Sequence, residues 1–213
     1  IQQTMKNIYV FGSVVRGEID QYSDVDLLLI TDEEIEDIDS NKYSIYTPQR
    51  IQEMYKEGNP FAWHLHYESK LVYTDNSNFL EDLQNPEPYK NGYEDLIKFE
   101  KLFKDSLKSM KEDQFSLTFD LAMIFLAIRN FATCYSLACY KRPIFSRNSF
   151  EKLTDFPLIL DDKVKNLLMR SRINSTRGIN YNIQEMELSL LIDKVDEIKV
   201  WFNKIIESYE SRI

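Results

Sequence analysis

Hydrophobic and polar positions follow two different patterns, and the change comes near residue 90. Before it, short apolar runs alternate with turn residues such as Gly12 and Gly58, a pattern typical of strands and short helices. Asn59 followed by Pro60 predicts a helix N-cap and first turn. The predicted strands span residues 8–11, 25–30, 43–46 and 71–73, and the predicted helices span 48–55 and about 60–69.

Beyond residue 90, apolar residues recur three and four positions apart, which indicates amphipathic helices that pack together. The predicted helices span residues 93–110, 114–140, 161–169 and 183–209. Their connecting loops contain Pro143, Pro157 and Gly178. We therefore predict an α/β domain over residues 1–88, followed by an all-α helical bundle over residues 89–213.

Composition narrows the classes of partner. The chain has 213 residues, is 43% hydrophobic and carries a formal net charge of -9. This charge argues against nonspecific binding to nucleic acid or to an anionic membrane, and it favours a small molecule, a metal-held nucleotide or a protein. Cys134 and Cys139 lack the spacing of a zinc site or disulfide scaffold, so we expect a reducing, cytoplasmic location and no membrane-spanning segment. A homodimer is compatible with the sequence, which does not determine the oligomeric state.

The most informative stretch is Phe11-Gly12-Ser13, followed by Asp24-Val25-Asp26. Side chains alternate along a strand, so Asp24 and Asp26 are expected on one face, with Val25 and Leu27 directed into the core. Two adjacent carboxylates repel each other, and a divalent cation such as Mg²⁺ relieves this repulsion. Gly12 permits a tight turn, and Ser13 offers a hydroxyl and a backbone N–H to a phosphate.

This Gly-Ser turn, a spacer of ten residues and an Asp-x-Asp strand resemble the signature of the DNA polymerase beta nucleotidyltransferase superfamily. The resemblance implies a mixed sheet with flanking helices, and transfer of a nucleotide from a triphosphate, with ATP the expected donor. It implies Asp24 and Asp26 as ligands of two Mg²⁺ ions. Ser13 would hold the β- and γ-phosphates, pyrophosphate would leave, and Arg16 is either an assisting residue or an ordinary surface arginine.

Active members of the superfamily usually carry a third carboxylate on the next strand, where it can accept the proton of the attacking hydroxyl. The strand 43–46 places Ser44 at that position, and a serine hydroxyl is no comparable base near neutral pH. Either Asp39 or Glu68 takes this role, or the catalytic set is incomplete.

Arginines also draw attention in the helical half. Residues 171–178 gather Arg172 and Arg177 in a predicted interhelical loop, from which they can reach the triphosphate; ordinary helix capping is the alternative. Arg129, within an apolar helix, predicts a buried acidic partner. This half resembles HEPN domains and the helical domains of antibiotic nucleotidyltransferases. HEPN ribonucleases place a histidine shortly after such an arginine, but none follows Arg129.

Two functions are consistent with these patterns. The first is a Mg²⁺-dependent nucleotidyltransferase whose acceptor is a small molecule, such as an aminoglycoside-like polycation, or a protein hydroxyl. The second is a catalytically inactive module of the same fold that serves binding or a toxin–antitoxin type of interaction.

The residues Trp63 to His66 are expected to form a half-buried helix rather than a zinc site.

Overall fold

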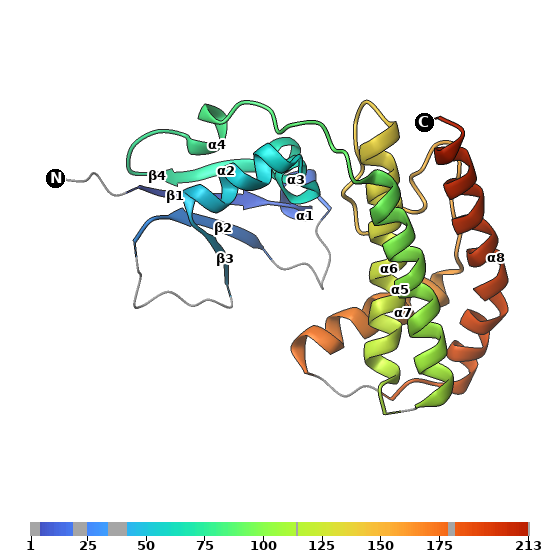
Figure 1. Cartoon of the computed structure of the whole chain (residues 1–213). Helices are drawn as coiled ribbons and strands as arrows, with labels where there is room; N and C mark the ends of the chain where they lie inside the picture. The colour runs from blue at the N-terminus through green and yellow to red at the C-terminus, as the bar shows by residue number, and fades with distance from the viewer. Residues whose placement is uncertain (1–4, 19–24, 34–41, 114, 179–181, 213) are drawn as a thin grey trace. The chain divides into compact units, whose positions relative to one another are not determined.

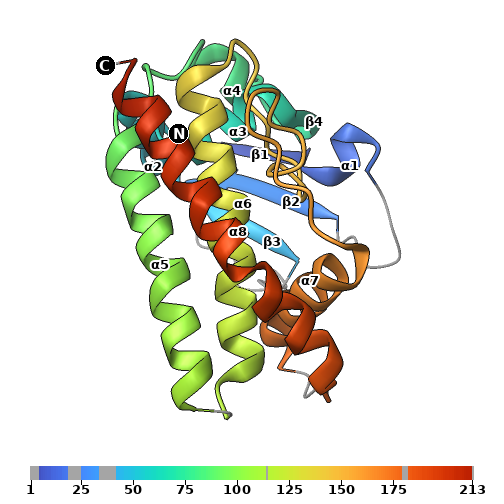
Figure 2. The same cartoon turned by 90° about the vertical axis from the view of Figure 1, so that its right-hand side faces the viewer.

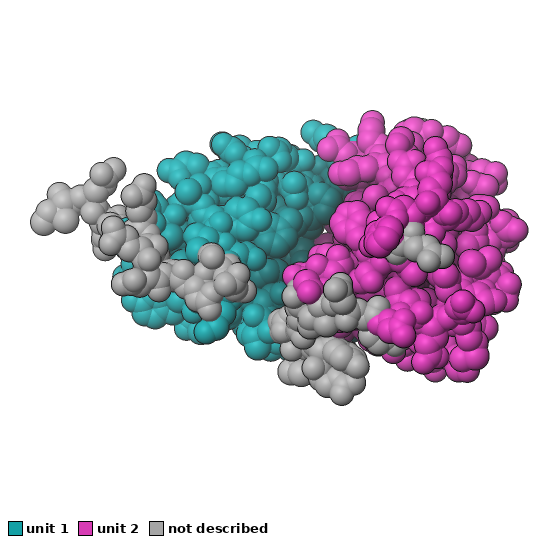
Figure 3. Space-filling view, turned by 90° about the horizontal axis from the view of Figure 1, so that it is seen from below, with its two compact units in different colours: residues 1–90 teal, residues 91–213 magenta. Residues whose placement is uncertain are grey.

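The computed structural model describes residues 5–18, 25–33, 42–113, 115–178 and 182–212 (Figure 1). The chain divides into two compact units, residues 1–90 and residues 91–213, which Figure 3 colours separately. Each unit has its own buried core.

Unit 1 is built on a four-stranded mixed sheet, as predicted. The strands are β1 (Lys6–Phe11), β2 (Asp26–Thr31), β3 (Tyr43–Tyr46) and β4 (Ser69–Thr74), in the order β3-β2-β1-β4 (Figure 1). Strand β1 is antiparallel to both β2 and β4, whereas β2 and β3 are parallel. The register pairs Phe11 with Asp26 on one side and with Ser69 on the other. The end of β1 therefore lies between the start of β2 and the start of β4.

Helices α2 (Pro48–Glu57) and α3 (Pro60–Glu68) cover one face of this sheet. Each begins with a proline that directly follows a capping residue. Thr47 caps α2 by accepting a hydrogen bond from the Arg50 N–H, and Asn59 caps α3 by accepting one from the Phe61 N–H. The core between helices and sheet includes Tyr9, Phe11, Leu28, Ile30, Ile51, Ala62 and Leu65. The single-turn helices α1 (Ser13–Arg16) and α4 (Phe79–Asp82) were not predicted, because a helix of one turn is too short to show a periodic pattern of apolar residues.

Unit 2 consists mainly of four long helices, of which α5, α6 and α8 run side by side in Figure 2. They are α5 (Gly92–Glu112), α6 (Leu117–Cys139), α7 (Asp162–Arg177) and α8 (Glu185–Glu210). Phe131 of α6 meets Phe202 of α8 edge to face, with 4.4 Å between ring centroids, and Phe103 of α5 lies 5.1 Å from Phe202. The predicted helical bundle is confirmed, and aromatic packing joins three of its helices.

Helix α6 is the most apolar element of unit 2. Within the described residues it is the one helix long and apolar enough to cross a membrane by length and composition. Most of its surface is nevertheless buried against α5 and α7, which is typical of a bundle core helix. Its Arg129 donates a hydrogen bond to the carbonyl of Phe145 at 3.5 Å, and Ser149 Oγ donates to the Arg129 carbonyl at 2.8 Å. These contacts fasten the connection between α6 and α7 to the core helix.

The interhelical loop predicted for residues 171–178 is wrong. Helix α7 continues through this stretch to Arg177 and ends at Gly178, which adopts the left-handed conformation with φ of 64°. Thr176 helps the last turn by donating its hydroxyl to the carbonyl of Arg172 at 2.8 Å. The polar residues of this stretch that suggested a loop therefore do not end the helix. Gly178 ends it.

Candidate active site

The turn after β1 is shaped by Gly12. Its φ of 74° and ψ of -137° lie in a region that is essentially restricted to glycine. The Gly12 N–H donates to the carbonyl of Glu68 at 3.2 Å, and the Gly12 carbonyl accepts from the N–H groups of Val15 and Arg16. This turn places Ser13, half-buried, as the first residue of α1. The turn after β1 is thus tied to the end of α3 on one side and to α1 on the other.

Asp26 is the first residue of β2 and lies beside this turn. A Cβ atom added to Gly12 would stand only 2.8 Å from Asp26 Oδ2, so the carboxylate occupies the space that any larger residue at position 12 would need. Asp26 is solvent-exposed, whereas Leu28 and Ile30, two and four residues along the same face, are in the core. The strand therefore presents its carboxylate just beyond the end of the buried layer.

The predicted direction of Val25 into the core is wrong. Val25 precedes β2, and its side chain is 57% exposed. The core under the helices contains Leu28 and Ile30, on the face of Asp26, and side-chain alternation directs Val25 to the opposite face. Asp24 lies outside the described residues, so the pairing of its carboxylate with that of Asp26 stays a prediction. Within the described part of the chain, no group of three His, Cys, Asp or Glu side chains forms a metal-binding cluster.

Arg16 lies at the centre of a half-buried charge network under the Gly12 turn. Its guanidinium forms an ion pair with Glu18 at 2.8 Å and a second one with Glu68. Glu68 Oε2 also lies 3.0 Å from His64 Nε2, one helical turn earlier in α3. The side chains of Arg16, His64 and Glu68 are each less than one-fifth exposed. Arg16 is therefore a structural part of this turn, not an isolated surface arginine.

The electrostatics of Glu68 follow from these contacts. Burial alone would raise the pKa of its carboxyl group, but the hydrogen bond with His64 and the charge and hydrogen bond of Arg16 outweigh burial and lower the pKa below its ordinary value. Burial likewise opposes the charge of Arg16, yet its contacts with Glu18 and Glu68 raise its pKa. A carboxylate with a lowered pKa is a poor proton acceptor, so Glu68 suits the role of holding the turn better than that of a general base.

This network makes a prediction about stability and pH. Because the pKa of Glu68 is lower in the folded chain, its ionised form stabilises the fold above the ordinary carboxyl pKa, and this contribution is lost as the pH falls through the folded pKa. Glu68→Gln is expected to lower the free energy of unfolding by about 2 kcal/mol at pH 7. Urea unfolding at successive pH values should show the difference from wild type shrinking as the pH falls below 4.

Glu53→Gln is the matched control, because Glu53 pairs with Arg50 at 2.9 Å on an exposed surface. That substitution should change the free energy of unfolding by less than about 0.5 kcal/mol. A Glu68→Gln effect that stays constant as the pH is lowered from 7 to well below 4 would contradict the charge-based explanation.

The predicted strand 43–46 is confirmed as β3, and its place as the strand of a third carboxylate stays a prediction. Strand β3 pairs in parallel with β2, and Ser44 stands opposite Leu28. Residues opposite each other in adjacent strands share a face, so Ser44 lies on the face of Leu28 and Asp26, where it is exposed. The sequence offered Asp39 and Glu68 as other candidates for the third carboxylate. Asp39 lies outside the described residues, and Glu68 is paired with Arg16 and His64.

The two arginines of the helical half lie in α7 of unit 2. Arg172 is half-buried in this helix, and Arg177 is its last residue. Gly12, Ser13, Arg16 and Asp26 all lie within unit 1 and meet around one turn. An approach of Arg172 and Arg177 to that turn stays a prediction.

The chain matches one family model in sequence and is similar in structure to a solved protein. The family model of the nucleotidyltransferase domain matches residues 2–117, which include the Gly12 turn, Asp26 and the whole sheet. Among solved structures, the chain is similar to the spectinomycin adenyltransferase AAD(9) from Enterococcus faecialis, solved with ATP and spectinomycin. The identity is 12% and the TM-score 0.44, over 97% of this chain and 92% of that chain. No curated protein matches the chain in sequence.

Proposed function

Because the chain belongs to the nucleotidyltransferase domain family, we propose that it moves a nucleoside monophosphate from ATP, or another nucleoside triphosphate, to a hydroxyl group of an acceptor. The observation that carries this proposal is the Asp26 carboxylate lying against Gly12, beside the turn that begins α1 at Ser13. In a catalytically inactive module, an exposed carboxylate beside a glycine whose backbone conformation other residues avoid would have no chemical role.

In this proposal, Asp24 and Asp26 hold Mg²⁺, which supplies charge neutralisation at the triphosphate. The acceptor oxygen attacks the α-phosphorus, the bond from that phosphorus to the oxygen bridging the α- and β-phosphates breaks, and pyrophosphate leaves. Ser13 binds the β- and γ-phosphates through its hydroxyl and backbone N–H. Arg16, held by Glu18 and Glu68, keeps the turn in place, and Arg172 and Arg177 are candidate phosphate ligands from α7.

The acceptor is proposed to be a small polycation or a protein hydroxyl. The formal net charge of -9 supports a cationic acceptor, because the field of the whole chain attracts such a molecule. A reducing cytoplasm is the proposed location, on the basis of two cysteines without disulfide spacing.

The alternative function is binding or assembly without turnover. Its support is Ser44, which lies exposed on the face of Asp26 where a third carboxylate would be expected. A serine there leaves the proton of the acceptor hydroxyl without an obvious carboxylate to receive it.

One experiment separates the two functions. The chain is incubated with ATP labelled at its α-phosphate and a panel of amino sugars and proteins, and both pyrophosphate release and label transfer are measured. Transfer that requires Mg²⁺ and stops on chelation is the expected result. Magnesium-dependent ATP binding without pyrophosphate release from any acceptor would favour the inactive module, and absence of ATP binding would contradict the proposed function.

A further inference from the structure

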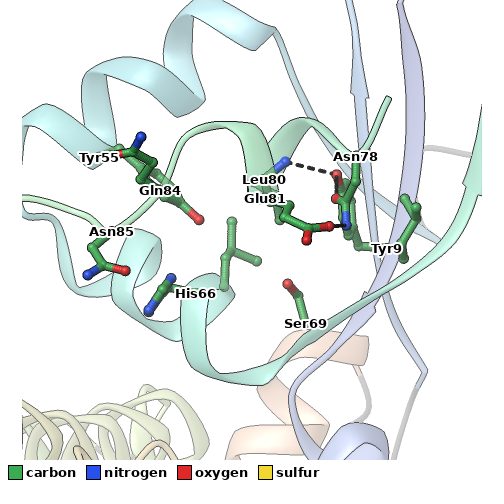
Figure 4. Close-up of a pocket in the computed structure, with 11 residues that line it drawn as sticks. Tyr9, Tyr55, His66, Ser69, Asn78, Leu80, Glu81, Gln84 and Asn85 are labelled. Atoms are coloured by element: carbon green, nitrogen blue, oxygen red, sulfur yellow. Dashed lines mark hydrogen bonds between the residues drawn. The ribbon is translucent and has the colours of Figure 1, made fainter. Parts of the chain in front are cut away.

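A cavity of about 350 Å³ lies within unit 1, and neither Gly12 nor Asp26 lines it (Figure 4). It is bounded by β1, α2, α3, β4 and α4, and its volume is within the usual range of small-molecule pockets. The lining residues are Tyr9, Tyr55, Leu65, His66, Ser69, Leu71, Asn78, Leu80, Glu81, Gln84 and Asn85. Neither Asp26 nor Ser13 belongs to this set, so the cavity is separate from the candidate active site.

One part of the lining is fixed by hydrogen bonds. The Tyr9 hydroxyl donates to Asn78 Oδ1 at 2.8 Å and accepts from the Leu80 N–H at 3.0 Å. Asn78 Nδ2 in turn donates to Glu81 Oε2 at 3.0 Å. These bonds hold one carboxylate and one aromatic ring at the cavity wall, and Figure 4 shows the Glu81 carboxylate near Asn78.

Two lining residues depart from ordinary structure. Gln84 has a φ of 62°, and it is the one non-glycine residue with positive φ among the described residues. The hydroxyl of Tyr55, a residue only 4% exposed, is buried and has no hydrogen-bond partner within the described part of the chain. Backbone strain and unsatisfied buried groups both concentrate where proteins bind ligands.

The region around Tyr55 is also loosely closed. Tyr55 and Asn85 line a second cavity of about 310 Å³, so both residues border each of the two spaces. Gln84 and Asn85 are exposed, and their side-chain amide groups make no hydrogen bond within the described part of the chain. A ligand in the cavity can therefore pair with these side-chain amides, which line the cavity together with Tyr55.

The chemistry of the lining selects the ligand. Glu81 is its one carboxylate and no lysine or arginine belongs to it, while burial lowers the pKa of His66 and favours its neutral form. Phosphates are therefore disfavoured. Amide groups match the paired donor and acceptor on the edge of a nucleobase, and leucine and tyrosine side chains suit its flat apolar faces. We propose that this cavity binds an uncharged nucleoside, at a site distinct from that of the triphosphate.

The proposal does not depend on nucleotide transfer, and it is tested by binding. Adenosine, guanosine, cytidine and uridine are titrated separately into the full chain with a chelator present, and affinity is measured by calorimetry. At least one nucleoside should bind without Mg²⁺ and equally well to Asp26→Asn. Gln84→Gly, which removes an amide and relieves the backbone strain, should weaken binding about tenfold, and Tyr55→Phe should weaken it several-fold.

Tyr67→Phe is the matched control, since Tyr67 is exposed, stacks on Trp63 and does not line the cavity. It should leave nucleoside affinity unchanged. The thermal midpoint of each variant shows whether it is folded. Absence of binding by all four nucleosides would overturn the proposal, as would binding that is lost in Asp26→Asn but retained in Gln84→Gly and Tyr55→Phe.

Discussion

Asp26→Asn is expected to lower the rate of nucleotidyl transfer by a factor on the order of 10³ while the chain remains folded. Asparagine keeps the size of the side chain beside Gly12 but removes the charge that would hold Mg²⁺. Asp26 is exposed at the beginning of β2, so its replacement by a neutral side chain removes no core packing. Initial rates of pyrophosphate release across a range of Mg²⁺ concentrations measure the effect, and circular dichroism verifies the fold.

The same substitution at the other end of the strand provides the control. Asp32 directly follows β2, is exposed, and accepts a hydrogen bond from the Met5 N–H at 2.9 Å. Asp32→Asn changes the charge of the chain by the same amount but lies at the opposite end of the strand from the Gly12 turn. Equal losses of rate in both variants would point to the overall charge instead of a metal site, and an unchanged rate in Asp26→Asn would remove Asp26 from the catalytic set.

Local signals in the sequence were sufficient to predict most elements of the fold. The strand 43–46 was predicted with its exact limits, because its bounds are marked by turn residues and by Pro48 with its capping Thr47. The four long helices followed from their apolar periodicity. The last turns of α7 were missed because serine, asparagine and threonine are common in loops, and only the backbone shows that the helix continues to Gly178.

The candidate site was predictable only where its residues are close in the sequence. The Gly12 and Asp26 segments were recognised from their spacing, and the structure places them side by side through the pairing of Phe11 with Asp26. The ion pair of Arg16 with Glu68 joins residues 52 positions apart, and it depends on β4 lying next to β1. No spacing rule predicts such a contact, because it arises from the order of strands in the sheet.

Gly12→Ala is expected to damage both stability and activity. The backbone of Gly12, with φ of 74° and ψ of -137°, is strained for any residue with a Cβ, and the added atom would stand 2.8 Å from Asp26 Oδ2. Strain of this kind costs about 1–3 kcal/mol of unfolding free energy. The displaced carboxylate should lower the transfer rate about 100-fold, because small errors in the position of catalytic groups have large effects on rate.

Gly17→Ala separates the strain from the contact. Gly17 also has positive φ, 72°, but a Cβ added there meets no atom within 4 Å. Gly17→Ala should therefore cost about 1 kcal/mol of stability and leave the transfer rate nearly unchanged, since no carboxylate has to move. Urea unfolding and initial rates of pyrophosphate release, measured on both variants, make the comparison. If the two substitutions lowered the rate equally, backbone strain in the turn would explain the loss, and the close contact between position 12 and Asp26 would have no role of its own.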